Sequence, residues 1–121
     1  MTATYPAIPS MPPIVCTPWC EDQDGHPDSV LREDQTCWGP DAYVDLSLEP
    51  VGRDEYGVYP PKLGARAYRQ WPGKTPCVYI HIEDVVIGNE PIDTALHLTA
   101  AEARQLSANL AAAADAIEPT G

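Results

Sequence analysis

The sequence contains no phenylalanine, few basic residues and no long uninterrupted apolar run. Without phenylalanine, a core has to be built from Val, Ile, Leu and Ala, with three Trp and six Tyr as the only aromatic side chains. No segment approaches the roughly 20 apolar residues of a membrane span. Residues 1–15 have neither a basic residue nor an apolar stretch, so they do not resemble a secretory signal. We therefore expect a cytoplasmic protein whose thiols stay reduced.

The scarcity of basic residues gives the chain a strongly acidic balance. It carries 7 Lys and Arg against 18 Asp and Glu, a formal net charge of −11. The acids are spread along the whole chain, and there is no acidic tail. The negative electrostatic potential of such a chain opposes binding to the phosphate backbone of a nucleic acid. Two interpretations remain open: an ordinary solvated surface, or an acidic surface that occupies a basic partner, as an inhibitor that mimics DNA would.

Signatures of common catalytic sites are also absent. There is no evident Ser-His-Asp set, phosphate-binding glycine loop or paired-carboxylate cleft, so we expect no enzymatic activity. The length of 121 residues predicts one domain. Four prolines among small residues predict a flexible, proline-rich arm over residues 1–15. Residues 16–118 are then expected to form a single zinc-stabilised domain.

Alternating apolar residues predict several strands. Within residues 42–51, Val44, Leu46 and Leu48 are expected to face one side of a sheet. The other strands are expected over residues 65–71, 77–87 and 95–98, with turns or loops over residues 50–64, 71–74 and 88–93.

The chain ends in an alanine-rich segment that predicts a helix. Thr99 and Glu102 have the spacing of a capping box. After them, apolar residues recur every three or four positions, from Ala103 through Leu106 and Leu110 to Ile117. The predicted fold class is α+β: an antiparallel sheet of three to four strands packed by one C-terminal helix, and preceded by a zinc-binding loop and the proline-rich arm.

Three of the four cysteines lie close together in the sequence with one histidine. Cys16, Cys20, His26 and Cys37 have the spacing C-x3-C-x5-H-x10-C. Three thiolates and an imidazole form a ligand set typical of structural zinc, and four protein ligands leave no open position for catalysis. We therefore predict a structural zinc ion as the cofactor.

Other interpretations of this cluster compete with zinc. Disulfides are disfavoured in a reducing compartment, and unrelated free thiols would not need to cluster. An iron–sulfur cluster on Cys16, Cys20, Cys37 and Cys77 is an alternative, because thiolates also hold such clusters. Cys77 is also the alternative to His26 as the fourth zinc ligand, although a lone cysteine at the start of a strand is more often a small buried hydrophobe.

Several aromatic and histidine residues are candidates for a partner surface. Trp19 and Trp38 adjoin two of the cysteines, so they are expected to pack around the zinc loop or to anchor a partner. Tyr79, His81 and His97 are expected on the outward faces of their strands. There they would be ordinary exposed side chains, or they would form a contact surface.

A second candidate surface combines basic and aromatic residues, a mixture that can bind single-stranded nucleic acid. The same pattern also describes the solvated face of an edge strand. The residues are Lys62, Arg66, Tyr68, Arg69, Trp71 and Lys74.

Two short motifs support a family resemblance. CTPWC at residues 16–20, followed by His26, and LTAAEARQLSANL at residues 98–110 resemble a small domain family of unknown function from actinobacteria and their phages. Cys37 lies outside these motifs, and the resemblance implies no activity. We expect a non-enzymatic zinc-binding domain that acts through protein–protein contact, as a phage or host regulatory or accessory protein. The alternatives are a nucleic-acid-binding regulator using residues 62–74 and the acidic DNA-mimic inhibitor.

Overall fold

The computed structural model describes residues 10–71 and 75–118. The chain forms two compact units, and the polypeptide passes between them three times. Unit 1 comprises residues 1–40 and 67–76, and unit 2 comprises residues 41–66 and 77–121. That residues 16–118 fold as one domain stays a prediction.

The predicted proline-rich arm is only partly covered. Its residues 1–9, like the predicted turn residues 72–74, lie outside the described residues. The end of the arm belongs to unit 1, because the backbone N–H of Met11 donates to Ser29 O at 2.8 Å and that of Ile14 donates to Gly25 O at 2.9 Å.

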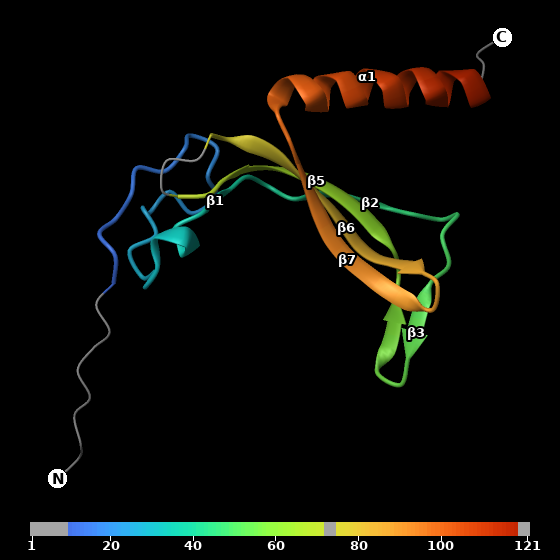
Figure 1. The fold of residues 1–121 in the computed structure, drawn as a ribbon, viewed down its shortest axis with the longest axis horizontal. Helices are drawn as coiled ribbons and strands as arrows, with labels where there is room; N and C mark the ends of the chain where they lie inside the picture. Colours follow the sequence, from blue (N-terminus) through green and yellow to red (C-terminus); the bar gives the residue numbers. More distant parts are fainter. Residues whose placement is uncertain (1–9, 72–74, 119–121) are drawn as a thin grey trace. The chain divides into compact units, whose positions relative to one another are not determined.

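The predicted α+β fold class is confirmed. One sheet has five strands, with β1, β5, β6 and β7 in that order and β2 also paired with β5; a separate two-stranded sheet pairs β3 with β4 (Figure 1). Antiparallel pairing joins β1 and β2 to β5, β3 to β4, and β6 to β7. The strands are β1 (Cys37–Trp38), β2 (Ala42–Asp45), β3 (Gly52–Asp54), β4 (Gly57–Tyr59), β5 (Lys62–Arg69), β6 (Cys77–Ile87) and β7 (Glu90–Leu98).

Several predicted strand boundaries were wrong. The strand predicted from residue 42 ends at Asp45, and Leu48, expected to face inward, is 98% exposed. Residues 50–64 were predicted as turns, but they contain the β3–β4 hairpin and the start of β5. The predicted loop over 88–93 is largely strand, because β7 begins at Glu90 and pairs with β6 along its length. Backbone pairing with a long neighbouring strand outweighed the local loop signals of Pro91 and Asp93.

The sheet of unit 2 has one apolar and one polar face. Val78 pairs with Leu98 and Ile80 with Leu96, so these apolar side chains share a face. The alternate positions carry tyrosine, histidine and charged residues. A register irregularity between Ile82 and Val85 interrupts β6.

The C-terminal helix begins and is capped as predicted. Helix α1 (Ala100–Ile117) leaves the end of β7, as Figure 1 shows. The hydroxyl of Thr99 accepts from the backbone N–H of Glu102 at 3.1 Å, and the Glu102 carboxylate accepts from the Thr99 N–H at 2.8 Å. The hydrogen bond from the Thr99 backbone N–H to the carboxylate, followed by one from the Thr99 side chain, lowers the pKa of the Glu102 carboxyl. Leu106 and Leu110 face the apolar side of β6 and β7.

Unit 1 has little regular structure and a small core. Besides β1 and the end of β5, it contains one 3₁₀ turn, Arg32–Asp34. Its buried apolar residues are Ile14, Cys20 and Cys37, with Cys16, Trp19 and Trp71 packed against them. The core of this unit therefore consists mainly of the predicted zinc ligands.

Candidate metal centre

The four predicted ligands converge in unit 1. The Sγ atoms of Cys16, Cys20 and Cys37 and a ring nitrogen of His26 all lie within 4.8 Å of one another. Cys20 and Cys37 are buried, and the His26 side chain is only 10% exposed. This group could hold a metal ion.

The spacing within the group matches a single tetrahedral ion. His26 Nε2 lies 3.5 Å from Cys20 Sγ and 3.9 Å from Cys37 Sγ. Around zinc, bonds of about 2.3 Å to sulfur and about 2.0 Å to nitrogen at a tetrahedral angle place neighbouring sulfur and nitrogen ligands about 3.5 Å apart. The observed separations therefore require little adjustment to accept such an ion.

The other ring nitrogen of His26 faces two carboxylates. Nδ1 lies 3.6 Å from Asp22 Oδ2 and 3.9 Å from Asp24 Oδ1. A carboxylate that accepts from Nδ1–H leaves Nε2 unprotonated, so it can bind a metal ion. Asp24 also accepts from the backbone N–H of His26 at 2.9 Å, which fixes the loop beneath the ring.

The thiols differ in their readiness to ionise. Burial, aided by the neighbouring thiols, raises the pKa of Cys16 to about 11. Burial also acts on Cys20, but hydrogen bonds from the backbone amides of Gln23 and Asp22 and from the other thiols outweigh it and lower the pKa of Cys20 to about 7. Cys20 therefore supplies a thiolate more readily than Cys16, and metal binding would have to displace the proton of Cys16.

A tightly wound backbone carries the ligands. The backbone has positive φ at three positions: 54° at Gln23, 78° at Gly25 and 53° at His26. Residues other than glycine rarely adopt this left-handed conformation. At Gly25 a Cβ atom would lie 2.7 Å from the carbonyl oxygen of Ile14, so the position requires glycine. The side-chain amide of Gln23 (Nε2) donates to the backbone carbonyls of Thr17, Pro18 and Cys20. These hydrogen bonds close the first half of the loop.

Two residues that brace the centre were not predicted to do so. Gln35 is fully buried and donates to the carbonyls of Pro12 and His26, at 2.7 and 3.3 Å, while its Oε1 accepts from Arg32. Arg69 Nη2 donates to Val15 O at 2.8 Å and to Cys37 Sγ at 3.6 Å. No spacing rule identifies such residues, because their partners are distant in the sequence.

The tryptophans predicted beside the cysteines are engaged within unit 1. Trp19 packs against the buried cysteines. Trp38 lies on Tyr68, with ring centroids 4.5 Å apart, and pairs with it in the β1–β5 ladder. These contacts match the packing interpretation of both residues.

The basic and aromatic residues predicted for nucleic acid have intramolecular contacts. Arg66 forms an ion pair with Asp41 at 2.7 Å, and the guanidinium of Arg69 lies 5.3 Å from the ring centroid of Trp71 as well as against Cys37. Lys62 begins β5, and Lys74 lies outside the described residues. Binding of nucleic acid by this segment stays a prediction.

The predicted partner residues of unit 2, Tyr79, His81 and His97, lie on one surface with Tyr43 and Asp93, which were not predicted. We call these five residues the histidine face. His81 Nε2 lies 2.7 Å from Asp93 Oδ1, and His81 Nδ1 lies 2.9 Å from the Tyr43 hydroxyl. An ionised carboxylate only accepts, so Nε2–H donates to Asp93, and the Tyr43 hydroxyl forms a hydrogen bond with Nδ1. Tyr79 contacts His81 and His97 edge-on or tilted, with centroids 5.9 and 5.4 Å apart.

Sequence reasoning missed Tyr43 because a glycine on another strand positions it. Tyr43 pairs with Gly64 of β5, where a Cβ would lie 2.3 Å from the tyrosine ring. The ring therefore lies over β5 and reaches His81 on β6. Burial, followed by the charges of Asp41 and Glu83, raises the pKa of Tyr43, so the phenol stays protonated as a donor.

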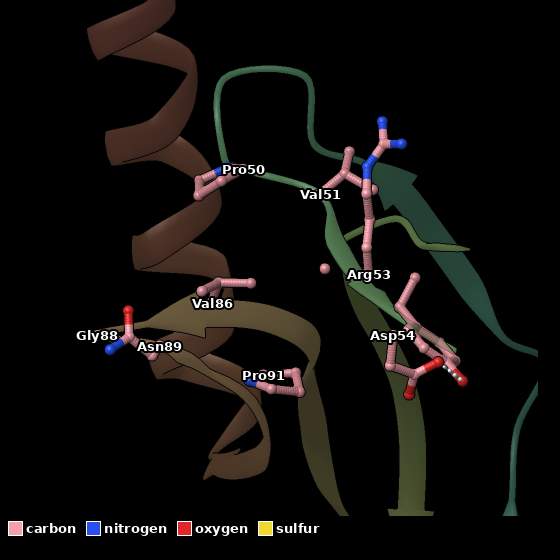
Figure 2. A pocket seen from close by; sticks show the side chains of 10 residues that line it. Pro50, Val51, Arg53, Asp54, Val86, Gly88, Asn89 and Pro91 are labelled. Atoms are coloured by element: carbon pink, nitrogen blue, oxygen red, sulfur yellow. Dashed lines mark hydrogen bonds between the residues drawn. The ribbon is translucent and has the colours of Figure 1, made fainter. Parts of the chain in front are cut away.

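Unit 2 also contains a cleft of about 440 Å³ beside the β3–β4 hairpin. Figure 2 shows Val86 and Pro91 on one side of it and Arg53 and Asp54 on the other. Asp54 accepts from the Tyr59 hydroxyl at 3.1 Å and from two backbone amides of its own turn, so its carboxylate closes the hairpin. The cleft brings together no described set of metal ligands.

Among the helices within residues 10–71 and 75–118, none combines the length and hydropathy of a membrane crossing.

The chain was compared with known proteins and protein families. Comparisons with curated proteins and with solved structures found no match. A family model described as Domain of unknown function (DUF6907) matches residues 2–120, and the chain therefore belongs to this uncharacterised family.

Proposed function

We propose that this protein is a non-enzymatic domain in which a structural zinc ion stabilises unit 1, and which acts by contact with another protein. One observation carries the proposal: the sulfur atoms of three cysteines and one imidazole nitrogen lie within 4.8 Å of one another. Four protein ligands complete a tetrahedral shell, so the ion would have no open position for a substrate. A regulatory or accessory role in an actinobacterium or its phage is the biological setting that we expect.

The spacing favours one ion over an iron–sulfur cluster. A cluster places several iron and sulfide ions between its ligands, so its thiolates stand further apart than those around a single ion. Cys77, the fourth thiolate that a cluster would need, begins β6 in unit 2, whereas His26 completes the group in unit 1.

The small core of unit 1 also supports a structural metal. Within the described part of unit 1 the buried apolar residues are Ile14, Cys20 and Cys37, and of these only Ile14 is not a candidate ligand. A core of this size contributes too little to offset the conformational entropy of ordering the unit. Binding of zinc by short chains contributes about 10–16 kcal/mol, which is enough to hold such a unit together.

The histidine face is the contact surface that we favour. It combines two tyrosines, two imidazoles and the carboxylate of Asp93 on one side of the sheet. Unit 2 carries 12 acidic residues against 4 basic ones, a formal net charge of −8. Carboxylates and aromatic rings together suit arginine and lysine side chains, so the expected partner presents a basic segment.

A catalytic role for the same face is the competing interpretation. Tyr43, His81 and Asp93 have the order of a nucleophile, a base and an orienting acid. A lowered pKa would help to activate a nucleophile, but the pKa of Tyr43 is raised, which leaves general-base assistance by His81 as the only route to activation. The face is also separate from the residues that line the cleft beside the hairpin. Binding is therefore the better-supported role.

The zinc proposal is tested by the metal content of protein purified under reducing conditions. We expect about one zinc ion per chain in the wild type and in Cys77→Ser, and loss of stoichiometric zinc in Cys37→Ser. Cys77→Ser is the matched control, because it removes a partly buried cysteine outside the ligand group. Iron with sulfide, or zinc retained in full by Cys37→Ser, would contradict the proposal.

The contact proposal is tested by titrating the protein with a short arginine-rich peptide. Binding is measured from changes in the NMR signals of the histidine rings. We expect binding at low salt that weakens as salt is added, and weaker binding to Tyr79→Ala. Tyr56→Ala is the control, because Tyr56 is an exposed tyrosine in the β3–β4 turn. No binding at low salt, or equal loss in both variants, would overturn the assignment of this face.

A further inference from the structure

Strand β7 forms an edge of the five-stranded sheet. It pairs with β6 on one side, and no strand of the described residues pairs with its other side. It is nine residues long, from Glu90 to Leu98. The edge therefore presents a long row of backbone donors and acceptors that can pair with another strand.

The second half of the edge, from Thr94 to Leu98, lacks the features by which soluble proteins prevent such pairing. Proline occurs only near its start, at Pro91, and the strand contains no lysine. From Thr94 to Leu98 it carries no Asp, Glu, Lys or Arg. The register irregularity of the β6–β7 pair lies between Ile82 and Val85, so the pairing of β7 from Thr94 to Leu98 is regular.

The apolar side of unit 2 is also incompletely covered. Apart from Pro61, none of its described apolar side chains is buried, and the buried residues Ile14, Cys20 and Cys37 all lie in unit 1. Leu96 is 55% exposed on β7, and on helix α1 Leu110 is 60% exposed and Ile117 87%. Leu96 therefore exposes an apolar side chain on the edge strand itself, and Leu110 lies over the same apolar side of the sheet. Exposed apolar side chains grouped on one side of a sheet mark an interaction site.

We propose that β7 pairs with β7 of a second copy of this chain. Antiparallel pairing of two identical strands is symmetric about a twofold axis, so each copy supplies the same edge to the other. The two sheets would then form one continuous sheet, with Leu96 of each copy near the new junction. The same junction brings the apolar helix faces of the two copies onto one side of that sheet.

The dimensions indicate that both the edge and the apolar side chains contribute. Seven residues from Ile92 to Leu98 span about 24 Å, at roughly 3.4 Å per residue. A stable interface usually buries about 800 Å² on each partner. Backbone pairing of two strands makes a narrow interface, so the dimer also requires burial of Leu96 and Leu110.

The acidic charge of unit 2 predicts an unusual dependence on salt. Two copies with a formal net charge of −8 in unit 2 repel each other, and dissolved salt screens that repulsion. Self-association should therefore strengthen as salt is added, whereas binding of a basic partner to the histidine face should weaken. The dimer does not depend on the metal centre, so the two proposals fail separately.

The test is the mass of the zinc-loaded full chain by analytical ultracentrifugation over a range of concentration and salt. The monomer has a mass of 13.1 kDa, and we expect a concentration-dependent shift to twice that mass. Leu96→Lys should weaken dimerisation by roughly tenfold or more, since it places two charges near the junction and removes two apolar side chains from it. Val44→Lys is the matched control: Val44 is 63% exposed and lies on β2, away from β7.

Hydrogen exchange on the unaltered protein gives a second measurement that needs no variant. Alternate amides of β7 that point away from β6 should exchange more slowly as the protein concentration rises. A wild-type chain that stays monomeric at submillimolar concentration and high salt would overturn the proposal. So would a dimer that Leu96→Lys leaves intact and Val44→Lys disrupts, or one that forms without protecting β7.

Discussion

Arg69→Gln offers a sharp test of how the metal centre is built. Arg69 is the basic side chain that touches a candidate ligand: its guanidinium donates to Cys37 Sγ at 3.6 Å and to Val15 O at 2.8 Å. Three thiolates and one Zn²⁺ ion carry a net charge of −1, so a fixed guanidinium compensates the charge of the loaded site. The substitution removes this charge and keeps a side chain of similar polarity.

The expected effect follows from these contacts. Loss of a residue that hydrogen-bonds to a metal ligand typically weakens metal affinity by about 10–100-fold, which corresponds to roughly 1.4–2.8 kcal/mol. The contact with the Trp71 ring adds a further contribution of about 0.5–1 kcal/mol to the stability of unit 1.

The assay is competition for zinc between the protein and a chromophoric chelator. Arg66→Gln is the control, because Arg66 lies on the same strand but forms its ion pair with Asp41 in unit 2. We expect Arg69→Gln to lose zinc affinity and Arg66→Gln to keep it. Equal affinity in the wild type and Arg69→Gln would refute the idea that the guanidinium supports the centre.

Three further predictions concern packing and capping. Gln35→Leu should destabilise unit 1 by about 1–3 kcal/mol in denaturant unfolding, because it leaves buried backbone carbonyls without their donor. Gly64→Ala should cost roughly 1–3 kcal/mol and move the NMR signals of the Tyr43 ring, since the new Cβ would overlap that ring. Thr99→Ala should cost about 1 kcal/mol of stability and reduce helical circular dichroism. Because capping lowers the pKa of Glu102, its contribution is fully present above the unfolded-state pKa and is lost as the pH falls through the folded value; helical circular dichroism should therefore fall on acidification, and less so in Glu102→Gln.

The elements that the sequence predicted well are those defined by neighbours along the chain. The capping box of α1 depends on residues three positions apart, and β6 alternates apolar and polar residues from Val78 to Glu83. The four candidate metal ligands lie within 22 residues, so their close spacing in the sequence was enough to predict a metal site. In each case the physical cause is local, and a periodicity or spacing rule captures it.

The features that were missed depend on distant parts of the chain. Gln35 was not predicted because its acceptors lie 23 and 9 residues away, and Arg69 because its acceptor Val15 lies 54 residues away. The start of β7 was read as a loop because its pairing with β6 outweighs its own residue preferences. Leu48 fitted an alternating pattern, yet the strand ends before it, and nothing in the local sequence marks that end.

The most direct test of the central claim, that a metal ion organises unit 1, is hydrogen exchange of the full chain before and after zinc is removed by a chelator under reducing conditions. The amides of Ile14 and Gly39 form backbone hydrogen bonds within unit 1, to Gly25 and Ala67. We predict that both lose their protection when zinc is removed and regain it when zinc is restored. Unchanged protection of these two amides in the zinc-free protein would contradict the claim.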